Sequence, residues 1–418
     1  MTTLTSLARF VHELELDCLP PETLDRLELH LLDTLGALDA GLKIADAKPL
    51  GAKGSSLLAY VAATRETELD DIHLPSCITP GSVVVPTALS LSTASPRDFL
   101  AALAVGYELM LRLGLAIGGP SILGRGIWPT LFTAPLASTA TAARALRLSL
   151  EQTTGALATA LALTSGTAIR PGSSSTSRWM TLGWAAETGV HAAKAARENI
   201  LGPPDLLEGL GFRLAGVDLS ETAIVEALGD RWRIDELSLK PYPVARQALA
   251  AVEACRELGE AHRLEPSVVD EVLVRVPGPQ RVVIDRPGVP ETRFESIASV
   301  QYLAALALVA PAELPDFHRT PVFVNDELRN LAARVRVESA PELEHHYPRI
   351  WPARVAIRCG RERHEKELLH PPGDVESGFG WDAVIAKYRF GDKSWAHELR
   401  RLHQKAVFPS SWPQITSA

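Results

Sequence analysis

The sequence predicts a mainly α-helical protein with a large all-helical domain and a smaller α+β domain. Three observations lead to this fold class: leucines in residues 23–38 recur at spacings of three and four, residues 138–163 are rich in alanine and poor in charge, and valines alternate with other residues from position 272. Spacings of three and four indicate helices, whereas period-two alternation indicates strands. At 418 residues with 46% hydrophobic content, the chain has room for about two domains.

The stretch TLDRLELHLLDTLGAL, residues 23–38, predicts one amphipathic helix that begins near Pro21. Its apolar face carries Leu24, Leu27, Leu31 and Leu35, and its opposite face carries Asp25, Arg26, Glu28 and Asp33. Residues 82–114 are apolar enough to suggest a membrane span, but Pro96 divides them and no uninterrupted apolar window reaches about 18 residues. We therefore expect two buried helices there and no membrane association.

Strand periodicity is confined to the stretch after about residue 264. VDEVLVRVP, AARVRVESA and PARVAIRCG predict three strands, and SIASVQYLAALAL and NDELRNLAARV predict helices between them. We expect a helical domain over residues 1–263, an α+β domain over 264–390 and a C-terminal helix over 391–418 that returns to the helical domain.

Composition excludes several classes of protein. The formal charge of −8 leaves no basic stripe for nucleic acid. Cys18, Cys77, Cys255 and Cys359 are far apart, and no histidine cluster or GxGxxG fingerprint is present, so we expect no metal and no organic cofactor. The opening MTTLTSLARFVHELELD does not read as a secretory signal, which favours a cytoplasmic protein.

Two polar stretches in apolar context are candidates for chemistry. ETELDDIHLPSCITPGSVVVP contains His73 beside carboxylates, an arrangement suited to general acid–base catalysis. Taken by itself, an acidic loop with a capping aspartate is the more common explanation of such a stretch. TAIRPGSSSTSRWMTLGWAAETGVHAAKAA brings Arg178 to a helix start after a Gly/Ser-rich loop, which suits a carboxylate or phosphate, while a flexible surface loop is the alternative.

The third stretch is LSLKPYPVARQALAAV. Pro241 holds the preceding Lys240 in an extended conformation, and Arg246 opens the next helix. A lysine at a rigid elbow can lose its proton if it is desolvated, whereas most lysines before prolines are solvated.

These stretches and their order resemble the MmgE/PrpD superfamily. Matching text is LLDTLGALDAG, LDDIH with the Asp70-Asp71 pair, PGSVVVPTALSL, VGYELMLRLG, WPTLF, LLEGLGF, KPYP, SIASVQYLAALAL and the terminal AKYRF. The resemblance implies a helical domain formed by both termini, an α+β lid, a homodimer and a cofactor-free site between the domains. It also implies small di- or tricarboxylate substrates and removal of a proton from the carbon next to a carboxylate.

By position, the resemblance assigns Glu68 where the family usually has an aspartate, Arg178 where it usually has a lysine, and Lys240 and Tyr302 where it has the same residues. We take Lys240, Tyr302 and His73 as candidates for proton transfer. The candidates for substrate binding are Glu68, Asp71, Arg178, Arg246 and, within WPTLF, Trp128 and Thr130. A core residue of a lid helix is the alternative interpretation of Tyr302.

The sequence departs from the family at three histidines, whose places hold Thr79, Trp128 and Leu249. A dehydratase must protonate a hydroxide leaving group, and imidazoles are the groups that move protons near neutral pH. An epimerase needs only to remove a proton and return it to the opposite face while cations hold the developing charge. We therefore expect an epimerase or isomerase like iminodisuccinate epimerase. The alternatives are a hydro-lyase or decarboxylase, like 2-methylcitrate dehydratase or cis-aconitate decarboxylase, and a non-catalytic carboxylate-binding protein.

Overall fold

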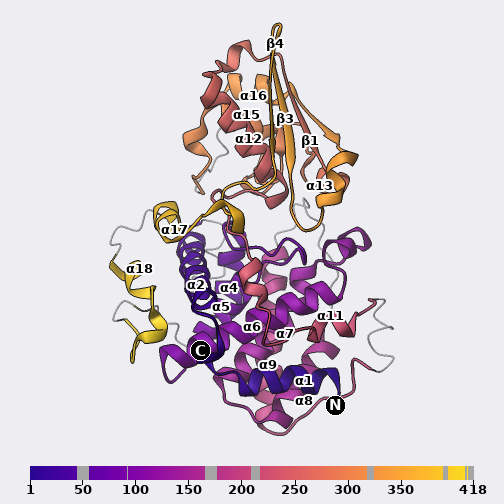
Figure 1. The fold of residues 1–418 in the computed structure, drawn as a ribbon, viewed down its shortest axis with the longest axis vertical. Coiled ribbons are helices and arrows are strands. Elements are labelled where there is room, and N and C mark those ends of the chain that lie inside the picture. Colours follow the sequence, from indigo (N-terminus) through magenta and orange to yellow (C-terminus); the bar gives the residue numbers. More distant parts are fainter. Residues whose placement is uncertain are drawn as a thin grey trace. The chain divides into compact units, whose positions relative to one another are not determined.

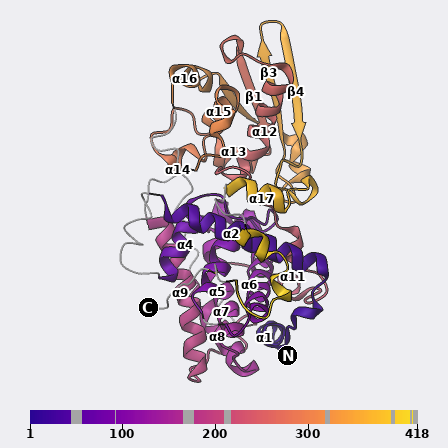
Figure 2. The same ribbon diagram turned by 90° about the vertical axis from the view of Figure 1, so that its left-hand side faces the viewer.

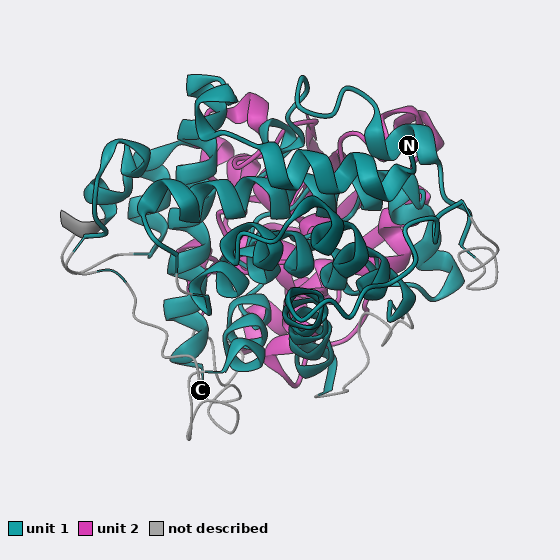
Figure 3. Cartoon of the chain, turned by 90° about the horizontal axis from the view of Figure 1, so that it is seen from below, with its two compact units in different colours: residues 1–169, 175–238, 380–418 teal, residues 170–174, 239–379 magenta. Residues whose placement is uncertain are grey.

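The computed structural model describes residues 1–44, 56–91, 93–164, 177–208, 217–317, 324–388, 394–409 and 412. Contacts divide these residues into two compact units, coloured separately in Figure 3. Unit 2 is formed by the described residues of Leu239–Phe379, and unit 1 by the described residues before Leu239 and from Gly380 onward. The expected boundary at residues 390–391 and parts of the LLEGLGF and AKYRF motifs lie outside the described residues.

Unit 1 is built from helices (Figure 1). They are α1 (Thr3–Glu13), α2 (Pro21–Leu42), α4 (Leu57–Glu66), α5 (Gly81–Leu89), α6 (Pro96–Ala116), α7 (Pro129–Ala145), α8 (Leu150–Ala162), α9 (Ser177–Arg197), α11 (Glu221–Val225), α17 (Trp381–Tyr388) and α18 (Ser394–Leu399). The helix α7 packs against both α6 and α9, and α4 packs against α2 and α9. Residues distant in the sequence therefore meet around α7.

The predicted amphipathic helix is α2, and it begins at Pro21 as expected. Its charged face differs from the prediction, because Glu28 and Asp33 are buried rather than solvated. The carboxylate of Glu28 accepts hydrogen bonds from the backbone N–H groups of Arg401 and His403. Asp33 pairs with Lys387 at 2.6 Å. Residues after position 380 thus cover the side of α2 that the sequence pattern assigned to water.

The apolar stretch of residues 82–114 forms two helices, α5 and α6, which confirms that prediction. Ser95 caps the second helix, since its hydroxyl accepts a hydrogen bond from the N–H of Asp98 at 3.2 Å. Among the described residues, α6 is long and apolar enough to cross a membrane, but 94% of its most apolar window is buried. That degree of burial within unit 1 is typical of a core helix.

Unit 2 contains a mixed four-stranded sheet with helices. The strands are β1 (Glu271–Val276), β2 (Val335–Ser339), β3 (Ala353–Cys359) and β4 (Glu362–Leu368), in the order β2-β1-β3-β4. β1 is parallel to β2 and antiparallel to β3, and β3 is antiparallel to β4. The helices are α12 (Arg246–His262), α13 (Gly278–Ile284), α14 (Arg293–Ser296), α15 (Val300–Val309) and α16 (Asp326–Ala332).

The three predicted strands are confirmed as β1, β2 and β3, and the mainly helical fold with a small sheet is confirmed with them. The strand β4 was not predicted from the sequence, because its residues are mostly charged and partly exposed. Charged side chains are usual on an edge strand, because they discourage pairing with other chains. Such a strand does not show the apolar alternation that identified the others.

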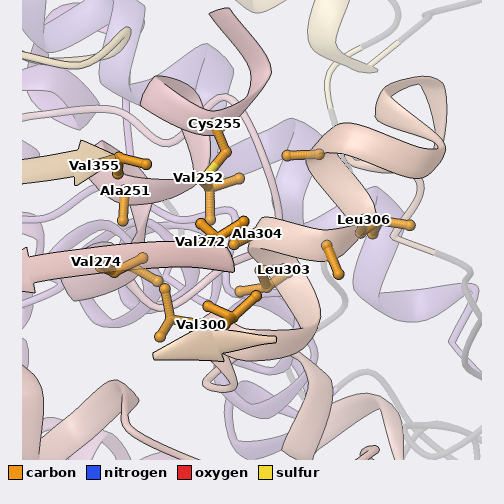
Figure 4. Close-up of a cluster of buried hydrophobic side chains, with 14 of the residues drawn as sticks. Ala251, Val252, Cys255, Val272, Val274, Val300, Leu303, Ala304, Leu306 and Val355 are labelled. Atoms are coloured by element: carbon orange, nitrogen blue, oxygen red, sulfur yellow. The ribbon is translucent and has the colours of Figure 1, made fainter. Parts of the chain in front are cut away.

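The core of unit 2 lies between α12, α15 and the sheet (Figure 4). Ala251, Val252 and Cys255 of α12 belong to this core, and α12 packs against α15, β3 and β4. This packing places α12 in unit 2, so contacts begin that unit at Leu239 rather than at residue 264. The helical spacing of apolar residues does not show which domain a helix packs against. The domain boundary predicted from the sequence was therefore placed where the first strand begins.

Candidate functional site

The acidic loop, residues 67–73, follows α4 in unit 1. The amide of Leu69 donates to the hydroxyl of Thr67 at 3.0 Å, and Glu68 adopts a left-handed conformation with φ of 55°. This turn brings two carboxylates to one guanidinium: Nη1 of Arg65 lies 2.9 Å from Oε1 of Glu68 and 3.2 Å from Oδ1 of Asp70. A left-handed non-glycine residue costs of order 1–3 kcal/mol and often lies at a functional site.

Two arginines and two indoles form a cluster in unit 1. The guanidinium carbon of Arg178 lies 4.1 Å from the ring centre of Trp128 and 5.1 Å from that of Trp179. Arg65 lies 5.2 Å from the Trp179 ring and 5.9 Å from the Trp128 ring. The indoles meet edge to face at 6.2 Å. We call these four side chains the arginine–indole cluster.

The electrostatics of this cluster bear mainly on Arg178, because Arg65 is already paired with the carboxylates of Glu68 and Asp70. Burial lowers the pKa of Arg178 to about 10, and the positive charge of Arg65 acts in the same direction, while Glu68 opposes it. An anionic group beside Arg178 relieves that repulsion and forms charge-assisted hydrogen bonds. The cluster is therefore chemically suited to a carboxylate.

Sequence analysis identified Glu68, Arg178 and Trp128 and missed Arg65 and Trp179. The structure brings all five into one neighbourhood. Arg65 lies three residues before Glu68 and Trp179 directly follows Arg178, so each missed residue was adjacent to a candidate. Without a fold, nothing distinguished Arg65 from a surface arginine at the end of a helix.

Thr130 is buried in the first turn of α7, two residues after the helix cap at Trp128. Its hydroxyl accepts a hydrogen bond from the amide of Thr79 at 3.3 Å. The structure thus joins the start of α7 to the segment before α5. A role for Thr130 in substrate binding stays a prediction.

Asp71 is fully buried and bonded to protein groups. Its Oδ1 accepts from the amide of Gly81 at 2.8 Å, and its Oδ2 accepts from the hydroxyl of Tyr107 at 3.2 Å and lies 3.1 Å from Nδ1 of His30. Asp71 therefore anchors the acidic loop to α2, α5 and α6. A direct contact with substrate stays a prediction for this residue.

His73 is also fully buried, and both ring nitrogens have partners. Nδ1 lies 2.7 Å from the hydroxyl of Ser76, and Nε2 lies 3.1 Å from Oε2 of Glu236. Burial lowers the pKa of His73, although Glu236 acts against that shift. These contacts make His73 a link between the acidic loop and residues 233–238, and a catalytic role for it stays a prediction.

Lys240 lies in unit 2 and is 1% exposed. The preceding residue, Leu239, donates its amide to the carbonyl of Gly373 at 2.8 Å. Gly373 has φ of 100°, and a Cβ at that position would clash with the carbonyl oxygen of Leu239. Only glycine fits there without strain, so the loop at residue 373 fixes the backbone just before Lys240.

Arg246 begins α12, and its buried guanidinium pairs through Nη2 with Oδ1 of Asp374, the residue after Gly373. Its Nε and Nη1 are buried without a hydrogen-bond partner among the described residues. Buried guanidinium N–H groups normally have acceptors, so these two are available to an anion. Sequence analysis missed Asp374, since the text PPGDVESG signals only a turn.

Within the described residues, one group of side chains has the spacing for a metal ion: His370, Asp374 and Glu376. Asp374 already pairs with the guanidinium of Arg246, and a cation beside that charge would be repelled. These residues are consequently a poor metal site.

Tyr302 is fully buried in α15 and belongs to the apolar core of unit 2. Its amide donates to the hydroxyl of Ser299, which caps the helix. This environment agrees with the interpretation of Tyr302 as a core residue, and its part in proton transfer stays a prediction.

The fold is that of a mainly helical protein with a small mixed sheet, and its candidate residues are arginines, carboxylates and a lysine suited to small acids. Comparison of the sequence with family models identifies the MmgE/PrpD N-terminal domain in residues 54–213 and the MmgE/PrpD C-terminal domain in residues 242–400. The chain belongs to the MmgE/PrpD family.

Two curated relatives are both named cis-aconitate decarboxylase. The mouse enzyme (Mus musculus) is 26% identical over 297 residues, which is 67% of this chain and 59% of that enzyme. The human enzyme (Homo sapiens) is 26% identical over 375 residues, or 81% of this chain and 76% of that enzyme. The chain thus matches less than two thirds of the mouse enzyme's length.

Proposed function

We propose that this protein is a cofactor-independent enzyme that removes a proton from the carbon next to a carboxylate of a small di- or tricarboxylate. Within that class, we propose an epimerase or isomerase. The observation that carries the proposal is the burial of Arg178 beside Arg65 and two indoles, because such a site favours a carboxylate. The homodimer that the resemblance implies remains part of the proposal.

The proposed chemistry needs cations that stabilise negative charge. When a base takes the proton, the electron pair of the broken C–H bond delocalises onto the neighbouring carboxylate and forms an enediolate. We propose Arg178 and Arg246 as carboxylate clamps, since positioned guanidiniums stabilise charge that develops in the transition state. The two buried N–H groups of Arg246 without partners among the described residues support its part in this.

The proposed proton acceptor is the neutral amine of Lys240. The side chain of this lysine is buried, and Pro241 restricts the direction in which it leaves the backbone. Tyr302 is the proposed donor that returns a proton to the opposite face of the carbon. Removal and return of one proton leave the composition of the substrate unchanged, and the product is its epimer.

A decarboxylase is the second candidate, and it is favoured by the name of both curated relatives. Loss of carbon dioxide breaks a C–C bond and leaves its electron pair on carbon, where a proton must then be delivered. The proposed donor is His73 or Lys240 in its protonated form. A hydro-lyase needs in addition an acid for the departing hydroxide, and the places of three family histidines hold Thr79, Trp128 and Leu249.

Incubation with small carboxylic acids in deuterated water separates these reactions. The panel contains cis-aconitate and dicarboxylates with a stereocentre next to a carboxylate. Deuterium at that carbon, with loss of optical activity and no change in composition, is the expected result. Release of carbon dioxide or water would show that the protein is a lyase and not an epimerase. No reaction with any compound of the panel would support a carboxylate-binding protein without catalysis.

A further inference from the structure

Helix α17 lies along α2 within unit 1 (Figures 1 and 2). Near its start, the indole N–H of Trp381 donates to Oδ1 of Asp25 at 3.1 Å. At its end, Nζ of Lys387 donates to Oδ1 of Asp33 at 2.6 Å. A Cβ at Gly36 would clash with the ring of Tyr388, so this glycine permits the close approach of the two helices.

Lys387 makes a second contact that α17 does not need for packing on α2. Its ammonium donates to the carbonyl oxygen of Leu69 at 2.8 Å. Leu69 lies between Glu68 and Asp70, the two carboxylates that hold Arg65. One buried ammonium therefore joins α2, α17 and the acidic loop.

The charges around Lys387 explain why this contact is strong. The side chains of Lys387 and Asp33 are 3% and 0% exposed, and a buried pair interacts in a medium of low dielectric constant. An ammonium has three donors, so the ion pair with Asp33 leaves donors for the carbonyl of Leu69. Hydrogen bonds from a charged donor are about twice as strong as those between neutral groups.

We propose that Lys387 is a positioning residue for carboxylate binding. It holds the carbonyl of Leu69, which directs Glu68 and Asp70 toward Arg65 and so fixes the arginine–indole cluster. The contacts run in sequence from Lys387 to Leu69, from its neighbours to Arg65, and from Arg65 to Trp128 and Trp179. This inference rests on the proposed function of the cluster.

The test compares two variants that loosen α17 in different ways. Lys387→Met with Asp33→Asn removes both charges together and the contact with Leu69, so no unpaired charge remains buried. Trp381→Phe is the matched control, because it removes the hydrogen bond at the other end of α17 and leaves Leu69 untouched. A residue that only holds α17 in place predicts similar effects for the two variants.

Hydrogen exchange at the amides of residues 68–71 is the first readout. In the double variant we expect amide exchange at these residues to be at least about tenfold faster than in the wild type, because a charged hydrogen bond is lost. In Trp381→Phe we expect the exchange rate to stay near that of the wild type. An exchange rate in the double variant equal to that of the wild type, or the same increase in rate in both variants, would overturn the inference.

Binding of succinate, measured by calorimetry, is the second readout. The double variant should bind this dicarboxylate about tenfold more weakly or worse, and Trp381→Phe should bind it like the wild type. Unchanged affinity in the double variant would overturn the inference. If the wild type does not bind succinate, the proposed carboxylate site is wrong for this ligand, and the exchange experiment still decides whether Lys387 positions the loop.

Discussion

The guanidinium of Arg178 lies over the ring of Trp128 at 4.1 Å from its centre. Both side chains are buried, and Arg65 contributes a second positive charge to the same pair of indoles. Arg65 is already paired with the carboxylates of Glu68 and Asp70, so Arg178 is the cation of this cluster that we propose for a substrate carboxylate. Arg178 is therefore the residue on which the proposed carboxylate binding depends most.

Replacement of Arg178 by glutamine should weaken binding of a dicarboxylate by about 10- to 100-fold, since a hydrogen bond to a charged group contributes about 1.5–3 kcal/mol. Calorimetry with succinate measures the effect. Arg197→Gln is the control, because Arg197 lies in the same helix with its side chain 54% exposed. Equal affinities of wild type and Arg178→Gln would remove Arg178 from the proposed site.

His73 should make the protein less stable in mild acid. Burial lowers the pKa of His73 in the folded state, so the unfolded chain binds this proton more readily. The stability that neutral His73 contributes is complete above the unfolded pKa of about 6.5 and is lost as the pH falls below it, by at most about 1.4 kcal/mol per pH unit.

Urea unfolding of wild type and His73→Gln between pH 8 and 5 checks this expectation, because glutamine does not titrate. The free energy of unfolding should fall more steeply with decreasing pH in the wild type. Parallel profiles would mean that His73 is not the titrating group.

The pair of Arg246 and Asp374 should be costly to break. Asp374→Ala leaves a buried guanidinium without its partner, which typically costs about 3–5 kcal/mol of unfolding free energy. Glu365→Gln is the control, since its pair with Arg363 is about half exposed and such pairs contribute less than about 1 kcal/mol. Chemical denaturation measures both variants, and similar values for the two would refute the burial argument.

Gly373→Ala should displace the segment that carries Lys240. The new Cβ would meet the carbonyl oxygen of Leu239 in a backbone conformation with φ of 100°. We expect at least about tenfold slower proton exchange on the substrate, because small misplacements of a catalytic group are costly. Gly360→Ala is the control: its φ is 61°, but no atom lies within 4 Å of its added Cβ. The same loss of rate in both variants would show that backbone strain alone is responsible.

The apolar pattern of the sequence was sufficient to predict α2, the pair α5 and α6, and three of the four strands. It was not sufficient for the charged side of α2. Asp33 is buried by Lys387, which lies 354 positions away, and no local spacing reports such a contact. The edge strand β4 escaped detection for a related reason, since its charged residues resemble those of a loop.

Some residues of the candidate site could be predicted from the sequence, and others could not. Arg178 and Glu68 were identified because burying a charged residue within an apolar stretch is costly unless the charge is paired or used. Their positions also match those of charged residues in the family. Arg65 and Asp374 matter through partners that the fold supplies, namely two indoles in one case and a buried guanidinium in the other. His73 had the right residue type for catalysis, and only the structure showed that Ser76 and Glu236 hold both its nitrogens.

The central claim is that Lys240 takes a proton from the carbon next to a substrate carboxylate. The most direct measurement is incorporation of deuterium into an identified substrate by the wild type, Lys240→Ala and Lys240→Arg in deuterated water. We predict exchange by the wild type alone, with dicarboxylate binding retained in Lys240→Arg, because a guanidinium keeps the charge and does not readily give up its proton. Exchange by Lys240→Ala at a rate near that of the wild type would contradict the assignment.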